Sequence, residues 1–233
     1  MDIDHRPTMQ YIQPLLNAFE AAANPTLAEP MKKYMKGRFE FYGIKAPQRR
    51  EIFKNFLKEY GLPPVAELED VVEALWEQPY RECHYAAVEI FQKFQKQFPP
   101  HQIALMEELI ATNSWWDTVD VIAAHLVGPF FRKYPDLIAS NTERWINCDN
   151  LWLQRTAIIY QLSYKGQTDS EQLFRFARQR ASSKEFFIRK SIGWALRQYS
   201  YHNPEAVRQF VEETPLHPLS KREALKGIAR KGI

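Results

Sequence analysis

Cysteine and glycine are scarce in this sequence of 233 residues, which contains two cysteines and eight glycines. Cys83 and Cys148 lie far apart, and no further cysteine or histidine stands at zinc-ligand spacing from either. We therefore expect two reduced thiols, no structural zinc and a cytoplasmic protein. The remaining histidines are dispersed without an H-x-x-x-H pair, which disfavours a metallohydrolase.

Long apolar runs are also missing. No segment approaches the ~18 uninterrupted apolar residues of a membrane-spanning helix. The N-terminal string MDIDHRPTMQ lacks the basic and apolar regions of a secretory signal. We therefore expect no membrane segment and no export.

Basic and acidic residues are both plentiful, but they are unevenly distributed along the chain. The formal net charge is +3, yet residues 1–140 carry 15 basic and 19 acidic side chains, whereas residues 141–233 carry 16 and 9. A basic half attracts polyanions such as nucleic acid, although a solvated lysine- and arginine-rich surface gives the same composition.

Convincing strand patterns are absent, and helical patterns fill their place. Strings such as VVEALWEQP and AAVEIFQKF repeat apolar residues at helical spacing, and prolines fall between the strings. Ser182 and Glu185 in SSKE predict a capping box at a helix start. The sequence predicts an all-α fold.

An internal repeat underlies the helical pattern. The strings CHYAAVEI, TVDVIAAH, LQRTAIIY and IRKSIGWA begin at residues 83, 118, 153 and 188, each 35 residues after the last, and SKREALKGI at 220 comes slightly early. Such a period is typical of helix-pair solenoids. We predict a single HEAT-like repeat domain over residues 1–233, with a concave face.

The third residue of each repeated string is polar or aromatic: these residues are Tyr85, Asp120, Arg155 and Lys190. Equivalent positions in stacked repeats line one surface, so they form a row, either functional or simply the polar flank of each helix. An acid among cations weakens phosphate binding. Asp120 should therefore form a salt bridge with Arg155, face a developing positive charge, or do both.

Aromatic residues accompany the row. In SWWDTVD, Trp116 precedes Asp120 by one helical turn; in FFIRKSIGWALR, Phe187, Lys190, Trp194 and Arg197 share a stripe. Cations bind phosphates, and aromatic planes bind bases, sugars or charged heterocycles. From spacing, we expect Phe186 and Ile188 in the core and Trp194 exposed.

Five strings together resemble one family. YMKGRFEFYGIKAPQRR, SWWDTVD, DNLWLQRTAI, SSKEFFIRKSIGWALRQY and PLSKREALK are similar, in this order from about residue 10 to 230, to AlkD-type alkylpurine DNA glycosylases. These are HEAT-like-repeat members of the DNA alkylation repair family.

The resemblance implies a monofunctional glycosylase without metal or cofactor. It would remove cationic purines, chiefly 3-methyladenine and 7-methylguanine, from duplex DNA and leave an abasic site for base excision repair. From the solenoid fold and the reduced thiols, we expect it to act as a monomer in the cytoplasm, on nucleoid DNA. By motif, the resemblance assigns catalysis to Asp120 flanked by Trp116 and Trp194, and DNA binding to Arg155, Tyr34, Phe186, Phe187 and Arg197; Lys190 joins the DNA-binding set from the stripe.

Two positions depart from the family pattern. Ser163 stands where a lysine is familiar, which removes one phosphate contact, and Lys45 stands where a glutamine is familiar. Neither touches the acid–aromatic set. The alternative function is a non-catalytic HEAT-like DNA-binding or protein-scaffold module, and a Schiff-base lyase using Lys190 is disfavoured.

Overall fold

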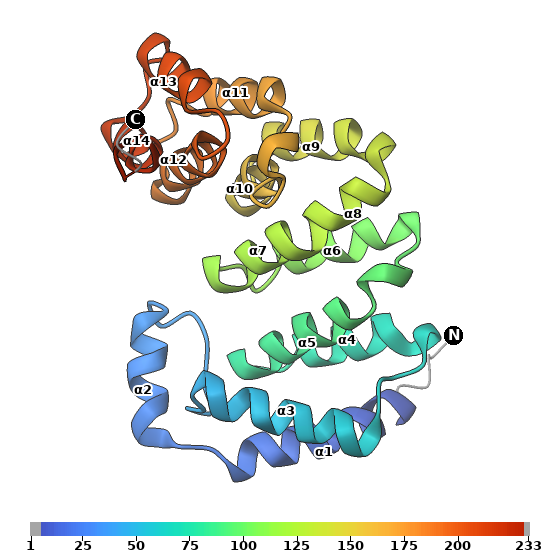
Figure 1. Ribbon diagram of the computed structural model, residues 1–233. Helices are drawn as coiled ribbons and strands as arrows, with labels where there is room; N and C mark the ends of the chain where they lie inside the picture. Colours follow the sequence, from blue (N-terminus) through green and yellow to red (C-terminus); the bar gives the residue numbers. More distant parts are fainter. Residues whose placement is uncertain (1–5, 231–233) are drawn as a thin grey trace. The chain divides into compact units, whose positions relative to one another are not determined.

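The computed structural model describes residues 6–230, and its regular structure there is helical apart from one isolated bridge between Glu40 and Tyr80. This confirms the all-α prediction. The chain divides into two compact units, residues 1–98 and residues 99–233, called here the first and the second unit. In Figure 1 the chain can be followed through both from blue to red.

Five α-helices make up the described part of the first unit. They are α1 (Arg6–Ala21), α2 (Pro25–Tyr34), α3 (Ala46–Tyr60), α4 (Leu68–Trp76) and α5 (Arg81–Lys93), with short 3-10 turns at Val65–Glu67 and Gln95–Gln97. Helix α1 packs on α3 and α4, and α4 packs on α5. The apolar stripes of α1, α4 and α5 are buried in this core, so the apolar spacing in the sequence has become the inner face of each helix.

The second unit carries the remaining helices. They are α6 (Ile103–Ala111), α7 (Trp116–Ile122), α8 (Gly128–Lys133), α9 (Ile138–Asn147), α10 (Leu151–Ile159), α11 (Ser170–Gln179), α12 (Phe186–Ser200), α13 (Pro204–Glu213) and α14 (Pro218–Arg230). A π-helical turn, Ala123–Val127, joins α7 to α8, and 3-10 turns lie at Pro100–Gln102, Pro135–Leu137 and Lys165–Gln167.

The helix starts reproduce the sequence repeat. Helices α5, α7, α10 and α12 begin at residues 81, 116, 151 and 186, and each repeated string starts at the third residue of its helix. Each of these helices contacts the α-helix before it, as in the pairs α4/α5, α6/α7, α9/α10 and α11/α12. Helix α14 completes a fifth pair with α13 and arrives early, as predicted. The helical-repeat fold is thus confirmed.

Side-chain caps set several helix starts, but not the one predicted. The Asn150 carboxamide accepts hydrogen bonds from the Trp152 and Leu153 amides (2.9 and 3.1 Å) and so fixes the start of α10. Helix α12 begins at Phe186, after the predicted capping box, and its N-cap Glu185 makes no side-chain capping bond. Instead, the Ser183 hydroxyl accepts from the Glu185 amide at 3.2 Å. The capping-box prediction was wrong: Glu185 is itself the N-cap, in an extended backbone conformation, and its amide binds Ser183.

A close approach of two helices shapes the end of the second unit. Helix α12 packs along α14, and glycines stand where they meet. A Cβ on Gly193 would lie 2.5 Å from the Glu223 Cβ, and one on Gly227 would lie 2.4 Å from the Ser200 hydroxyl. Only hydrogen fits at Gly193, whereas at Gly227 the Ser200 hydroxyl would have to rotate away, so Gly193 above all sets the distance between the helices.

Candidate active site

A bidentate salt bridge joins Asp120 on α7 to Arg155 on α10. The Arg155 Nε donates to Asp120 Oδ1 at 2.8 Å, and its Nη2 donates to Oδ2 at 3.0 Å. The remaining Nη1 donates to the carbonyl of Phe187 at 2.6 Å, at the start of α12. The predicted salt bridge is confirmed, and through it three successive repeats hold one carboxylate in place.

Burial is unequal across this salt bridge. The Arg155 side chain is 6% exposed, whereas the Asp120 side chain is 18% exposed. The guanidinium lies 5.7 Å from the ring centre of Trp194 and 5.8 Å from that of Phe187, within cation–π range. Arginine is therefore a fixed internal support, and the carboxylate is the partner that a ligand can reach.

The carboxylate opens onto a pocket of about 440 Å³. Helix α7 and the π-helical turn supply one wall; the turn after α10 and helix α12 supply the other. The lining residues are Trp116, Asp117, Asp120, Val121, Ala124, His125, Leu162, Ser163, Trp194 and Gln198. Both tryptophans are half-buried, so Trp194 is less exposed than predicted. The lining combines two indoles with two carboxylates and contains no lysine or arginine, which suits a planar cation.

The adjacent tryptophans of SWWDTVD have different roles. Trp115 is 9% exposed and packs against Trp152 and Phe187, with ring centres 5.5 and 5.0 Å apart. Trp116, the first residue of α7, lines the pocket. One indole thus anchors the helix start to the core while its neighbour faces the pocket.

The two phenylalanines at the start of α12 also differ. Phe187 packs on Trp152 at 4.9 Å, and its carbonyl binds Arg155. Phe186 is 56% exposed, so its predicted core position was wrong; Ile188 is fully buried, as predicted. Phe186 is the first residue of its helix, where no preceding turn covers the side chain, and its ring contacts that of Phe187.

Lys190 and Arg197 converge on a carboxylate that the sequence analysis missed. The buried Glu223 on α14 lies 3.5 Å from the Lys190 ammonium and 3.3 Å from the Arg197 guanidinium, and it also pairs with Lys226 at 2.5 Å. The hydrogen bond from Lys226, together with the charge of Lys190, lowers the pKa of Glu223 below its usual value. Of these contacts, the sequence could have indicated only the one between Glu223 and Lys226, which stand three residues apart.

His125 is a second residue that the sequence analysis missed. It lies exposed within the π-helical turn and lines the pocket. Isolated π-helical turns often occur at functional sites, but a π-helical turn has no signature in a single sequence. Ser163, the departure noted above, lies exposed on the opposite wall.

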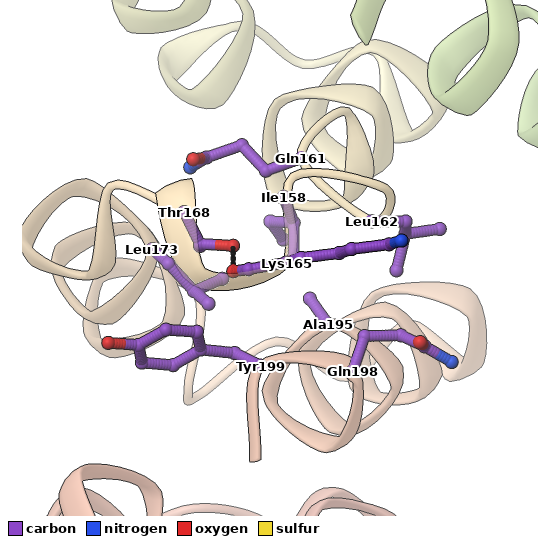
Figure 2. A pocket seen from close by; sticks show the side chains of 9 residues that line it. All are labelled: Ile158, Gln161, Leu162, Lys165, Thr168, Leu173, Ala195, Gln198 and Tyr199. Atoms are coloured by element: carbon purple, nitrogen blue, oxygen red, sulfur yellow. Dashed lines mark hydrogen bonds between the residues drawn. The ribbon is translucent and has the colours of Figure 1, made fainter. Parts of the chain in front are cut away.

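A small second cavity adjoins this pocket and shares Leu162 and Gln198 with it. Figure 2 shows the Lys165 side chain reaching across it toward Leu162. Lys165 adopts a positive φ of 55°, and the Thr168 hydroxyl donates to its carbonyl at 2.7 Å, as drawn in Figure 2. An exposed cation two residues after Ser163 is therefore held beside the pocket in an uncommon backbone conformation.

The remaining predicted positions belong to the first unit. Tyr34 is the last residue of α2 and is 69% exposed. Lys45 is exposed at the N-cap of α3. Tyr85, the first member of the predicted row, packs near the guanidinium of Arg49, 5.0 Å from the ring centre. The DNA-binding role of Tyr34 stays a prediction.

Two searches of the described residues found nothing. Between residues 6 and 230 no group of three or more histidine, cysteine, aspartate or glutamate side chains is placed to hold a metal ion. None of the helices in the same range combines the length and apolar character needed to cross a bilayer.

Comparison with known proteins gives family and fold. The family model described as DNA alkylation repair enzyme matches residues 15–228. A solved structure described as a predicted DNA alkylation repair enzyme from Enterococcus faecalis is similar, with 32% identity, a TM-score of 0.83, and coverage of 89% of this chain and 97% of that one.

Two structures from Streptococcus mutans share the fold at lower identity. AlkD2 is 17% identical with a TM-score of 0.61, covering 86% of this chain and 98% of its own. The protein smu.31, from strain UA159, is 18% identical with a TM-score of 0.59, covering 76% and 96%. No curated protein matches significantly. The family match spans nearly the whole chain and includes both helices that carry Asp120 and Arg155, so this chain belongs to the DNA alkylation repair enzyme family.

Proposed function

We propose that the chain is a DNA glycosylase that hydrolyses the N-glycosidic bond of cationic N-alkylated purines, such as 3-methyladenine and 7-methylguanine, in duplex DNA. The observation that carries this proposal is the Asp120 carboxylate, held by a buried arginine and reachable from a pocket walled by Trp116 and Trp194. A binding scaffold has no need of a fixed acid at this place, because a carboxylate repels phosphate.

The chemistry follows from the charge of the substrate. Alkylation at N3 or N7 makes the purine cationic, so the base leaves as a neutral molecule when the C1′–N bond breaks and its electron pair moves to nitrogen. Positive charge develops on the deoxyribose, as in glycoside hydrolysis. Asp120 stabilises this charge and orients the water whose oxygen bonds to C1′ and whose proton passes to solvent.

The tryptophans supply the remaining stabilisation. Their faces attract a cationic sugar or base, each by ~0.5–2 kcal/mol when water is excluded. Arg155 acts on Asp120 as a positioning residue, because both of its hydrogen bonds to the carboxylate come from a side chain fixed by burial. The pocket is open rather than sealed, which favours selection by lesion charge and lability over selection by base shape.

The experiment that tests this function is chromatography of bases released from methylated duplex DNA, without added metal and with a chelator present. We expect release of methylated purines well above the spontaneous rate. Release no faster than in a control without protein, with duplex binding intact, would favour the non-catalytic scaffold.

Replacement of Glu223 by glutamine is expected to lower the free energy of unfolding by about 1–3 kcal/mol at neutral pH, because a buried charged partner of Lys190 and Arg197 is lost. The pKa of Glu223 is lowered in the folded state, so its stabilisation is complete above the unfolded value of 4.5 and disappears as pH falls through the folded value. Denaturant unfolding from neutral to acid pH measures this. A difference in free energy of unfolding between wild type and Glu223→Gln that stays constant with pH would contradict this prediction.

The same variant should also bind duplex DNA several-fold more weakly, although its net charge rises by one. Glu223 restrains two flexible cations of α12 that would otherwise lose up to ~2 kcal/mol each of side-chain entropy on binding phosphate. The matched control is Glu205→Gln, which makes the same charge change in an exposed pair with Arg208. Tighter binding by Glu223→Gln would show that the carboxylate only competes with phosphate.

A further inference from the structure

Helix α2 of the first unit contributes no buried side chain to the core. The helix is described in full, and none of its ten residues is buried. Figure 1 shows it at the left, running crosswise to α1 and α3. A short helix in a protein owes most of its stability to a packed apolar face. Because α2 lacks one, its orientation must be set by the segments at its two ends.

Both ends of α2 are tied to one loop, residues 35–45. At the start of the helix, the Asn24 amide donates to the Tyr42 carbonyl at 2.8 Å. Gly43 adopts a φ of 88°, and a Cβ there would lie 2.1 Å from the Asn24 carbonyl oxygen, so only glycine permits this contact. At the other end, Gly37 turns the chain out of the helix with a φ of 72°. A shift of this loop would therefore move α2 with it.

Glu82, in the first turn of α5, holds the loop. Its Oε2 accepts a hydrogen bond from the Tyr42 amide at 3.0 Å, and its Oε1 accepts from the Gly43 and Ile44 amides at 3.0 and 3.2 Å. Glu82 is 1% exposed, so water does not compete for these charge-assisted hydrogen bonds. Loss of the carboxylate would leave backbone donors of the loop without their acceptor.

The neighbouring Arg81 ties the same loop at a second point. Its amide donates to the Glu40 carbonyl at 2.8 Å. Its side chain is fully buried, and the guanidinium lies 3.7 Å from the ring centre of Phe39. The start of α5 is therefore the fixed base of the loop, and the loop is the base of α2.

We infer that Glu82 is a positioning residue for duplex binding, which acts through Tyr34. Tyr34 is the last residue of α2 and is 69% exposed, and a tyrosine hydroxyl binds phosphate and sugar oxygens. The inference rests on the duplex ligand of the proposed function and on the predicted role of Tyr34, but not on bond cleavage. Glu82 itself is buried and does not touch the ligand.

The first measurement is amide hydrogen exchange of Glu82→Gln without DNA. Glutamine keeps one acceptor oxygen, but its amino group would face an amide of the loop, so the loop must move. The amides of α2 and of residues 42–44 should exchange at least about tenfold faster than in the wild type, while those of α10 should be unchanged. Wild-type exchange in α2 would overturn the inference.

The second measurement is a double-mutant cycle in the affinity for an undamaged duplex. Glu82→Gln should weaken binding at least about fivefold, and Tyr34→Ala should also weaken it. The double variant should bind no more weakly than Tyr34→Ala alone, because Glu82 acts only through Tyr34. Effects that multiply, as a general loss of structure would give, or wild-type affinity of Glu82→Gln would overturn the inference.

Two further variants control for charge and for folding. Glu51→Gln makes the same charge change at an exposed acid of α3 and should bind at least as tightly as the wild type. If denaturant unfolding shows that Glu82→Gln does not fold, Glu82→Asp replaces it in both measurements. Aspartate keeps the charge but is one methylene too short to reach all three amides, so the same two results are expected.

These readouts are distinct from that of the proposed function. A wild-type protein that releases no methylated base, while the cycle still couples Glu82 to Tyr34, retains the positioning role and loses the glycosylase. Release of methylated bases by the wild type, with independent effects of the two substitutions, retains the glycosylase and loses the positioning role.

Discussion

Replacement of Asp120 by asparagine is expected to slow the release of methylated purines about a thousandfold, equivalent to ~4 kcal/mol of transition-state stabilisation. Asparagine keeps the size and one acceptor of the side chain but cannot offset positive charge on the deoxyribose. Because the variant also removes a negative charge that faces phosphate, duplex binding should persist or strengthen. Single-turnover release of 7-methylguanine and a binding titration measure the two effects.

The structure adds a stability control to this variant. Arg155 is 5% exposed and would lose its charged partner, so unfolding must be measured alongside activity. Asp136→Asn is the matched control, since Asp136 is an exposed acid outside the pocket in the same unit. Wild-type release rates from Asp120→Asn would refute the role of the carboxylate. If Asp120→Asn loses both base release and folding, Asp120→Glu decides, because it keeps the charge. We expect Asp120→Glu to restore stability but not full activity.

Replacement of Gly193 by valine is expected to destabilise the protein by on the order of 3 kcal/mol and to reduce base release. The new Cβ would lie 2.5 Å from the Glu223 Cβ and 3.0 Å from the Ser220 carbonyl oxygen, so α12 and α14 must separate. Trp194, the next residue, forms part of the pocket wall and would move with α12. Thermal unfolding measures the effect, at roughly 2–4 °C per kcal/mol for a chain of this size.

A glycine with free space provides the comparison. A Cβ on Gly166, in the turn after α10, meets nothing within 4 Å, so Gly166→Ala should leave stability unchanged or raise it slightly. Equal stability of Gly193→Val and Gly166→Ala would mean that the two helices can adjust at no cost, and that the glycine does not set their distance.

Periodicity predicted the architecture because helices are built from local contacts. The spacing of 35 residues matches the starts of α5, α7, α10 and α12, and the shared register places Asp120 opposite Arg155. A repeat converts sequence distance into spatial distance, so this long-range salt bridge was predictable. The exposure of Phe186 and the cap of α12 were not predictable, because the start of a helix depends on a few competing hydrogen bonds, here at Ser183.

Contacts between helices that do not share the repeat register could not be predicted from the sequence. Glu223 lies in the early, shortened last repeat, so nothing in the spacing paired it with Lys190 and Arg197. The π-helical turn that brings His125 to the pocket, and the glycine contacts that let α14 approach α12, also depend on packing.

The amino-acid sequence by itself determined that this chain is a helical repeat carrying an acid between aromatic residues, because period and residue type are local properties. Tertiary structure alone decided which charges are compensated: Asp120 by a buried arginine, and two cations of α12 by one glutamate. Coulomb energies depend on distance and burial, and both are set only when helices pack.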